Sequence, residues 1–101
     1  MSVQTKKGLL EYCVLKILVV EPSYVYKMIE DLRNVINISE STLYSVVRRL
    51  SDGGFLQAVT KEHNGRIRRY YTMTDAGIGK LSSFTDEGQD LQKILQFILI
   101  Q

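Results

Sequence analysis

Apolar residues follow a helical spacing through the first third of the chain. From about Lys7 to Val20 they recur at steps of three and four and spread beyond a single stripe, which predicts a helix covered on more than one side. Pro22 stops this helix, and Ser23 is expected to cap a second helix that runs to about Val35. Two helices with buried stripes therefore open the fold.

The stretch STLYSVVRRL, residues 41–50, combines an apolar stripe with a polar side that carries hydroxyls and two arginines. The stripe recurs at spacings of three and four, which predicts a helix anchored in the core. It consists of Leu43, Val46, Val47 and Leu50. Ser39 is expected to cap this helix, and Gly53-Gly54 can adopt the left-handed conformation that ends one. A third helix is therefore predicted over about Glu40 to Asp52.

Two segments rich in aromatic and β-favouring residues, FLQAVTKE and RIRRYYTMT, come next. The Asn64-Gly65 pair between them is a strong signal for a two-residue turn, because both residues tolerate positive φ. A two-stranded hairpin is therefore predicted. Tyr70 and Tyr71 must point to its opposite faces, since side chains alternate along a strand, and the sequence leaves open which of them closes the core.

Thr74 is expected to cap a last helix, whose apolar residues alternate between steps of three and four. The seam consists of Leu81, Phe84, Gly88, Leu91, Leu95 and Ile98, widened by Ile94 and Leu99. Each glycine in this helix costs about 1 kcal/mol relative to Ala, so packing has to hold the helix. We infer that the seam faces a second subunit. The residues expected to carry dimerisation are Leu91, Ile94, Leu95 and Ile98.

The order of helix, helix, turn, helix, hairpin and helix places the chain in the α+β class, mostly α. It is the order of a winged helix-turn-helix, three helices plus a two-stranded wing, in which the third helix enters the DNA major groove. We expect residues 1–73 to form this DNA-binding domain. Residues 74–101 are expected to form a C-terminal dimerisation helix in the same compact unit, since 101 residues support one small core.

The polar side of the third helix is the first candidate DNA-binding surface. Hydroxyls at the start of such a helix can bind phosphates or base edges, and an arginine can make a forked contact to guanine. The candidates are Ser41, Thr42, Tyr44, Ser45, Arg48 and Arg49. Arg48 and Arg49 lie about 100° apart around the helix, so they are not expected to do the same job. The competing interpretation is a solvated helix face with Arg49 paired to a carboxylate.

Charge changes the interpretation of the hairpin, although the net charge of the chain is only +2. Residues 61–80 carry five Lys and Arg against two Asp and Glu, whereas residues 81–101 carry one against three. An anionic partner would therefore be met at the hairpin. Its candidate contacts to phosphates or the minor groove are Lys61, His63, Asn64, Arg66 and Arg68, with a solvated tip as the alternative for His63.

Two stretches, STLYSVVRRLSDGGFL and GRIRRYYTMTDAG, resemble the PadR family of transcriptional regulators with a short C-terminal helix. The resemblance covers roughly residues 8–80. It rests on a Thr-Leu-Tyr signature in the third helix and on a basic-Tyr-Tyr run that leads into a Thr-x-x-Gly helix start. The chain departs from the family at Ser45, commonly Pro, at Ser51, often acidic, and at Tyr24-Val25-Tyr26, usually His-Gly-Tyr.

The resemblance implies a homodimeric regulator of transcription, a repressor, that binds double-stranded operator DNA. Some members of the family bind flat apolar molecules between subunits, so a small apolar effector is a further implied partner. In this chain its pocket would be lined by Tyr12, Phe97 and Ile98. Ordinary dimer packing explains these three residues equally well.

Other classes of protein find little support in the residues. With a single cysteine, Cys13, one histidine and dispersed carboxylates, the chain offers no nucleophile-base pair, metal-ligand spacing or phosphate loop. We therefore expect no enzyme, metal or cofactor. Glu11 and Lys16 interrupt the apolar run over residues 9–20, which argues against a membrane span or signal peptide, and the unpaired cysteine favours the cytoplasm. The competing class is a winged-helix module that binds another protein through its C-terminal seam.

Overall fold

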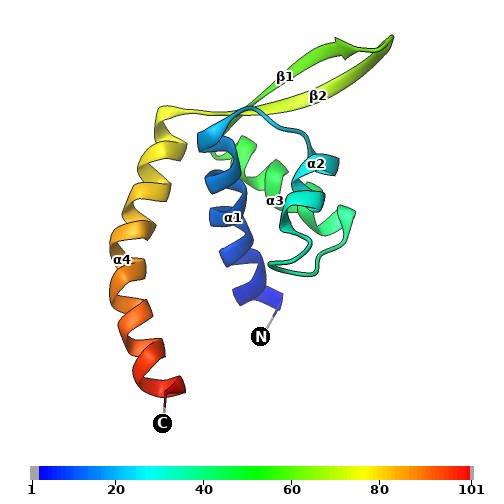
Figure 1. Ribbon diagram of the computed structural model, residues 1–101. Coiled ribbons are helices and arrows are strands. Elements are labelled where there is room, and N and C mark those ends of the chain that lie inside the picture. The colour runs from blue at the N-terminus through cyan, green and yellow to red at the C-terminus, as the bar shows by residue number, and fades with distance from the viewer. Residues whose placement is uncertain (1–2, 101) are drawn as a thin grey trace.

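The computed structural model describes residues 3–100, and the side chains of residues 5–100. Its elements, in chain order, are α1 (Val3–Val20), α2 (Val25–Leu32), α3 (Glu40–Asp52), β1 (Leu56–His63), β2 (Arg66–Met73) and α4 (Asp75–Leu99). In Figure 1 the helices α1 to α3 lie together, the hairpin extends away from them, and α4 runs beside α1. The winged helix-turn-helix of the mostly helical α+β class is thereby confirmed.

Helix α1 is the central element of the core. It begins earlier than the predicted start at Lys7 and packs against α2, α3, β2 and α4. The prediction that it is covered on more than one side is confirmed. Its fully or nearly fully buried side chains are Leu10, Val14, Leu15 and Leu18.

Ser23 does not cap α2, which corrects the sequence-based expectation. The N-cap is Tyr24, whose side chain makes no capping hydrogen bond, and α2 ends at Leu32 rather than near Val35. Ser23 instead forms an isolated β-bridge with Tyr71. The Ser23 N–H donates to the Tyr71 carbonyl at 3.2 Å, and the Tyr71 N–H donates to the Ser23 carbonyl at 2.8 Å. A partner so distant in the sequence outweighs the local capping preference.

Helix α3 has the predicted bounds, cap and core stripe. The Ser39 hydroxyl accepts a hydrogen bond from the Thr42 N–H at 3.2 Å. All four stripe residues are buried, namely Leu43, Val46, Val47 and Leu50. After the helix, Gly54 takes the left-handed conformation with φ of 81°, whereas Gly53 stays right-handed.

The hairpin turns at Asn64 and Gly65, whose φ values of 52° and 78° confirm the predicted two-residue turn. The two strands are antiparallel, with His63 opposite Arg66 next to the turn. Tyr71 is buried in the core and Tyr70 is only partly covered, which answers the question that the sequence left open.

Helix α4 makes contacts with the rest of the chain in its first part, whereas its last part is exposed to solvent. The Thr74 hydroxyl accepts from the Gly77 N–H at 3.1 Å, as the predicted cap should, and donates to the Gly54 carbonyl at 2.7 Å. Almost three turns after Thr74, at 3.6 residues per turn, Phe84 stacks on Tyr12 of α1, with ring centroids 3.9 Å apart. From Leu91 onward every described side chain is exposed. The free end of α4 contributes to an elongated shape of 55 × 27 × 21 Å.

Candidate nucleic-acid interface

The side of α3 opposite its buried stripe carries Ser41, Ser45 and Arg48, because each residue turns the helix by about 100°. We call these three the outward face of α3. All three are exposed. Among the described residues Arg48 forms no ion pair, so its guanidinium is available to an outside ligand.

Thr42 and Arg49 lie on the flank of α3 that faces α1. The Thr42 hydroxyl is 2.9 Å from the Ser39 hydroxyl, within hydrogen-bonding distance. Arg49 Nε lies 3.8 Å from Glu11 Oε1 of α1, in a pair that is largely exposed on the arginine side. Such a pair contributes little to stability, on the order of 1 kcal/mol or less, yet it draws Arg49 away from the outward face. The competing interpretation for Arg49, a carboxylate partner, thus matches the geometry.

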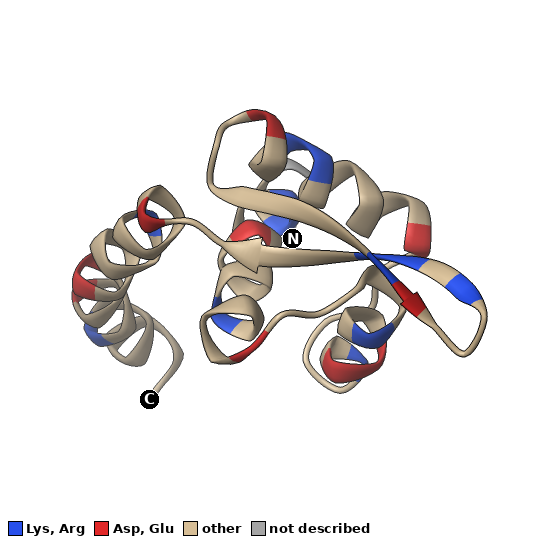
Figure 2. Cartoon of the chain, turned by 90° about the horizontal axis from the view of Figure 1, so that it is seen from above, with Lys and Arg blue, Asp and Glu red and all other residues tan. Residues whose placement is uncertain are grey.

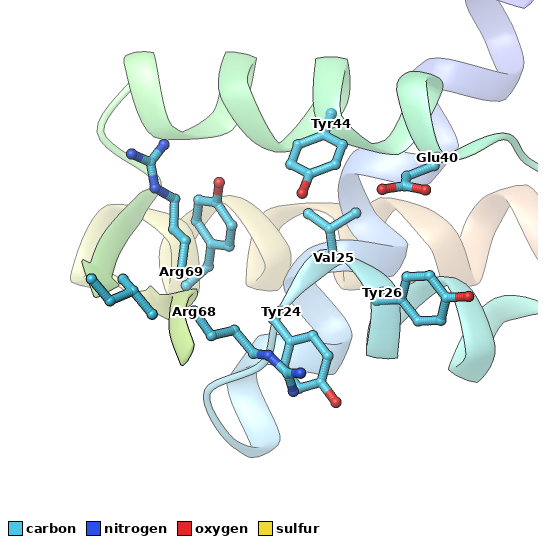
Figure 3. A pocket seen from close by; sticks show the side chains of 9 residues that line it. Tyr24, Val25, Tyr26, Glu40, Tyr44, Arg68 and Arg69 are labelled. Atoms are coloured by element: carbon cyan, nitrogen blue, oxygen red, sulfur yellow. The ribbon is translucent and has the colours of Figure 1, made fainter. Parts of the chain in front are cut away.

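Tyr44 lies on the other flank of α3, above a cleft that α3 forms with α2 and the wing. The cleft has a volume of about 450 Å³ and is lined by Tyr24, Val25, Tyr26, Glu40, Tyr44, Ile67, Arg68, Arg69 and Tyr71. Figure 3 shows Tyr44 extending from α3 toward Val25, and Arg69 reaching from β2 toward α3. The cleft therefore brings one predicted residue of α3 together with one predicted residue of the wing, Arg68.

The wing divides its basic side chains between two faces. Lys61 stands opposite Arg68 and His63 opposite Arg66, and directly opposed residues share a face, so these four lie on one side of the hairpin. Figure 2 shows the basic positions along the outer half of the hairpin. Asn64 occupies the turn itself. The residues predicted for the wing are thus brought together on one face and at its tip.

Two tyrosines support the same face at the root of the wing. The Arg68 guanidinium carbon lies 4.2 Å from the ring centroid of Tyr24, and the Tyr24 and Tyr70 rings meet edge to face at 5.4 Å. Lys61 Nζ lies 5.9 Å from the Tyr70 ring. These contacts hold Arg68 close to the protein body, so Arg66 is the more freely exposed of the two arginines.

Arg69 belongs to the other face of the wing and was not among the predicted contacts. It alternates with Tyr71, which is buried, so its side chain points to the α3 side and into the cleft. The signal that could have found it is strand alternation. That signal was unusable because the sequence did not reveal which of Tyr70 and Tyr71 is buried.

The residues suggested for an effector pocket do not meet within one chain. Tyr12 lines an apolar cavity of about 590 Å³ between α1, α2 and the first half of α4, together with Cys13 and Phe84. Phe97 and Ile98 are exposed. Phe97 lies roughly 20 Å along the helix from Phe84, at 1.5 Å per residue, and therefore cannot reach this cavity from the same chain.

The described residues outside these surfaces offer few reactive or metal-binding groups. Burial raises the pKa of the Cys13 thiol, which keeps it protonated and unreactive near neutral pH. Among residues 3–100, no group of three or more His, Cys, Asp or Glu side chains could hold a metal ion. No helix in that range is long and apolar enough to cross a membrane.

A capped helix with a free polar face, set beside a basic two-stranded wing, is the arrangement of winged-helix DNA-binding proteins. Residues 14–83 match the Transcriptional regulator PadR-like family, which is well over half of the chain. The chain belongs to this family. Its members are DNA-binding transcription factors without enzymatic activity, and the expectation that the chain is not an enzyme is confirmed.

Solved structures of similar proteins agree with this assignment. A protein of Streptococcus mutans is 34% identical with a TM-score of 0.85, covering 91% of this chain and 88% of its own. A PadR family transcriptional regulator of Eggerthella lenta is 29% identical with a TM-score of 0.82, covering 98% and 88%. The Bacillus subtilis PadR, solved in complex with operator DNA, is 22% identical with a TM-score of 0.71, covering 76% and 46%, and this likeness concerns the fold alone.

Proposed function

We propose that this protein is a homodimeric repressor that binds a double-stranded DNA operator. The observation that carries the proposal is the outward face of α3, which is polar, exposed and mounted on a stripe that is wholly buried. A helix anchored in this way keeps its orientation, so its side chains can meet base edges in the major groove. The proposed place of action is the cytoplasm, where a regulator of transcription would meet its operator.

The proposed contacts follow the two elements. On α3 they are Ser41, Thr42, Tyr44, Ser45 and Arg48, with Arg49 at the margin. On the wing they are Lys61, His63, Asn64, Arg66 and Arg68. Arg48 is the proposed base-reading residue, because it is unpaired within the described chain and can make a forked contact to guanine. The wing residues are proposed to contact phosphates or the minor groove, since their charge carries no sequence information by itself.

The proposed dimer rests on the exposed end of α4. Leu91, Ile94, Leu95 and Ile98 are all solvent-exposed in the single chain, although they follow the seam spacing that one would expect to be buried. Covering them with a second copy would also pair two α3 helices. Two recognition helices related by a two-fold axis read half-sites about one helical turn apart, whereas one reads too few base pairs for useful specificity.

The proposal extends to a small apolar effector that binds beside α1. The apolar cavity beside Tyr12 could hold one. Phe97 and Ile98 would line that cavity only if they came from the partner subunit, because a single chain keeps them about 20 Å away. The effector hypothesis therefore requires the proposed dimer.

An electrophoretic mobility shift with DNA from upstream of the protein's own gene, at increasing salt, tests the function. DNA binding predicts a saturable shift whose affinity falls steeply, on the order of 10³-fold or more between about 50 and 200 mM salt for several phosphate contacts. The alternative is a protein-interaction module with a solvated wing. That alternative predicts no saturable shift at about 150 mM salt.

A further inference from the structure

Two lysines at the start of α1 lie beside the beginning of α3, although more than thirty residues separate them in the sequence. They line a cleft of about 180 Å³ with three residues of the segment that leads into α3 and one residue of its first turn. The lining residues are Lys6, Lys7, Asn37, Ile38, Ser39 and Thr42. Sequence reasoning passed over both lysines because they stood at the predicted edge of a core helix, far from the basic hairpin.

The cleft is chemically suited to an anion. It is lined by two cations, an amide and two hydroxyls, and no carboxylate lines it. Within residues 5–100 neither lysine has a salt-bridge partner. Glu11, the next carboxylate along α1, is engaged by Arg49. The Ser39 hydroxyl accepts the Thr42 N–H and lies 2.9 Å from the Thr42 hydroxyl. One hydroxyl proton joins this pair and the other is left, so when Ser39 donates to Thr42 the Thr42 proton can be donated to an outside oxygen.

The position of the cleft beside α3 indicates which anion would bind there. Thr42 lies on the α1 flank of the outward face, whereas Tyr44 lies on the wing flank. A helix in the major groove, about 12 Å wide, has a phosphate backbone on each side. The wing supplies cations on one side only, and among the described elements α1 is the one that borders the other.

We propose that Lys6 and Lys7, together with the Thr42 hydroxyl, bind a backbone phosphate of the operator on the side of α3 opposite the wing. This inference rests on the proposed function. With both flanks held, α3 is clamped between two strands of the duplex. Because phosphate contacts carry no sequence information, the site contributes equally to operator and to unrelated DNA.

The test is the salt dependence of DNA binding by the variant Lys6→Gln/Lys7→Gln. The probe is a duplex of about 30 base pairs that the wild-type protein selects from a randomised library, long enough for two half-sites. A mixed-sequence duplex of the same length is the second probe. Each lost phosphate contact lowers the slope of log affinity against log salt by about 0.9, so a decrease of about 1 to 2 is expected on both probes.

Two matched variants separate a local site from a general loss of charge. Lys16→Gln removes one lysine from the same helix, about 15 Å further along, and should leave the slope unchanged. Lys6→Arg/Lys7→Arg keeps both charges and should keep the slope. Thermal unfolding of each variant verifies that α1 is intact.

The possible outcomes distinguish this inference from the proposed function. A wild-type slope in the Gln variant, with steep binding by the wild type, overturns the lysine site and leaves the regulator intact. An equal decrease with Lys16→Gln also overturns the site, because net charge alone then accounts for the effect. Absence of a saturable complex with the wild type at any salt overturns both.

Discussion

Helix α3 buries all its aliphatic side chains and exposes a polar face, whereas α4 from Leu91 onward exposes aliphatic and aromatic side chains. The difference is one of solvation. A polar face is stable in water until a polyanion arrives, but exposed apolar area costs about 25 cal/mol per Å² relative to burial. The proposed DNA-binding surface is therefore complete in a single chain, while the apolar end of α4 is left uncovered there.

The largest effect should come from removing the unpartnered end. Deletion of residues 86–101 is expected to yield monomers in sedimentation velocity, because the exposed seam is lost. Operator affinity should fall on the order of 10²- to 10⁴-fold, since the second half-site no longer binds in the same complex. A stable dimer without these residues would show that the subunits meet elsewhere.

A point variant makes the same test without shortening the chain. Leu91→Asp/Leu95→Asp places two charges on the seam and should also give monomers. Gln92→Asp/Gln96→Asp adds the same charges at the same spacing to residues that are already polar, and should remain dimeric if the seam is the interface.

The substitution Arg48→Ala on the outward face of α3 should weaken DNA binding. Loss of a forked base contact costs about 1–3 kcal/mol on the preferred site and much less on random DNA. Fluorescence anisotropy with both duplexes measures the difference. Arg33→Ala, which removes an exposed arginine from the end of α2, is the control. Equal losses on both duplexes would reassign Arg48 to a phosphate.

Substitutions in the wing should change the salt dependence of DNA binding more than its sequence specificity. Arg66→Gln/Arg68→Gln is expected to lower the salt slope by about 2 for each bound subunit, one contact for each arginine, and so by about 4 for the proposed dimer. Arg33→Gln/Lys93→Gln removes the same charge at two positions outside the hairpin, after α2 and within α4, and should keep the slope. If the wing variant keeps it too, the wing does not touch DNA.

The smallest expected effect concerns the anchoring of α3. Ser39→Ala removes the hydroxyl that accepts the Thr42 N–H, and should lower the free energy of unfolding by about 1 kcal/mol in urea denaturation. Ser45→Ala, on the exposed face, should change it by less than about 0.5 kcal/mol. Equal changes would mean that the cap does not hold the helix.

Features specified by neighbouring residues could be predicted from the sequence. The caps at Ser39 and Thr74 and the turn at Asn64 and Gly65 depend on groups within three or four residues, so their signals survive whatever the rest of the chain does. Ser23 shows the limit of this reasoning. It carries a good local capping signal, but the edge of β2 offers its backbone two hydrogen bonds instead.

In the candidate site, too, some features depend on neighbouring residues and others on contacts between distant elements. The polar side of α3 and the basic wing were predictable because helical and strand periodicity place each side chain relative to its own element. The position of Arg69 in the cleft depends on which of the two tyrosines is buried. The position of Lys6 and Lys7 beside Thr42 depends on how α1 packs against α3.

The sequence alone determined the elements of this protein, their order and the polar or apolar character of each face, because these follow from spacing within a few residues. Only the tertiary structure decided which faces meet. The β-bridge of Ser23, the burial of Tyr71 and the approach of two α1 lysines to α3 join residues dozens of positions apart. Such contacts depend on how the elements pack around a common core, and no local pattern encodes them.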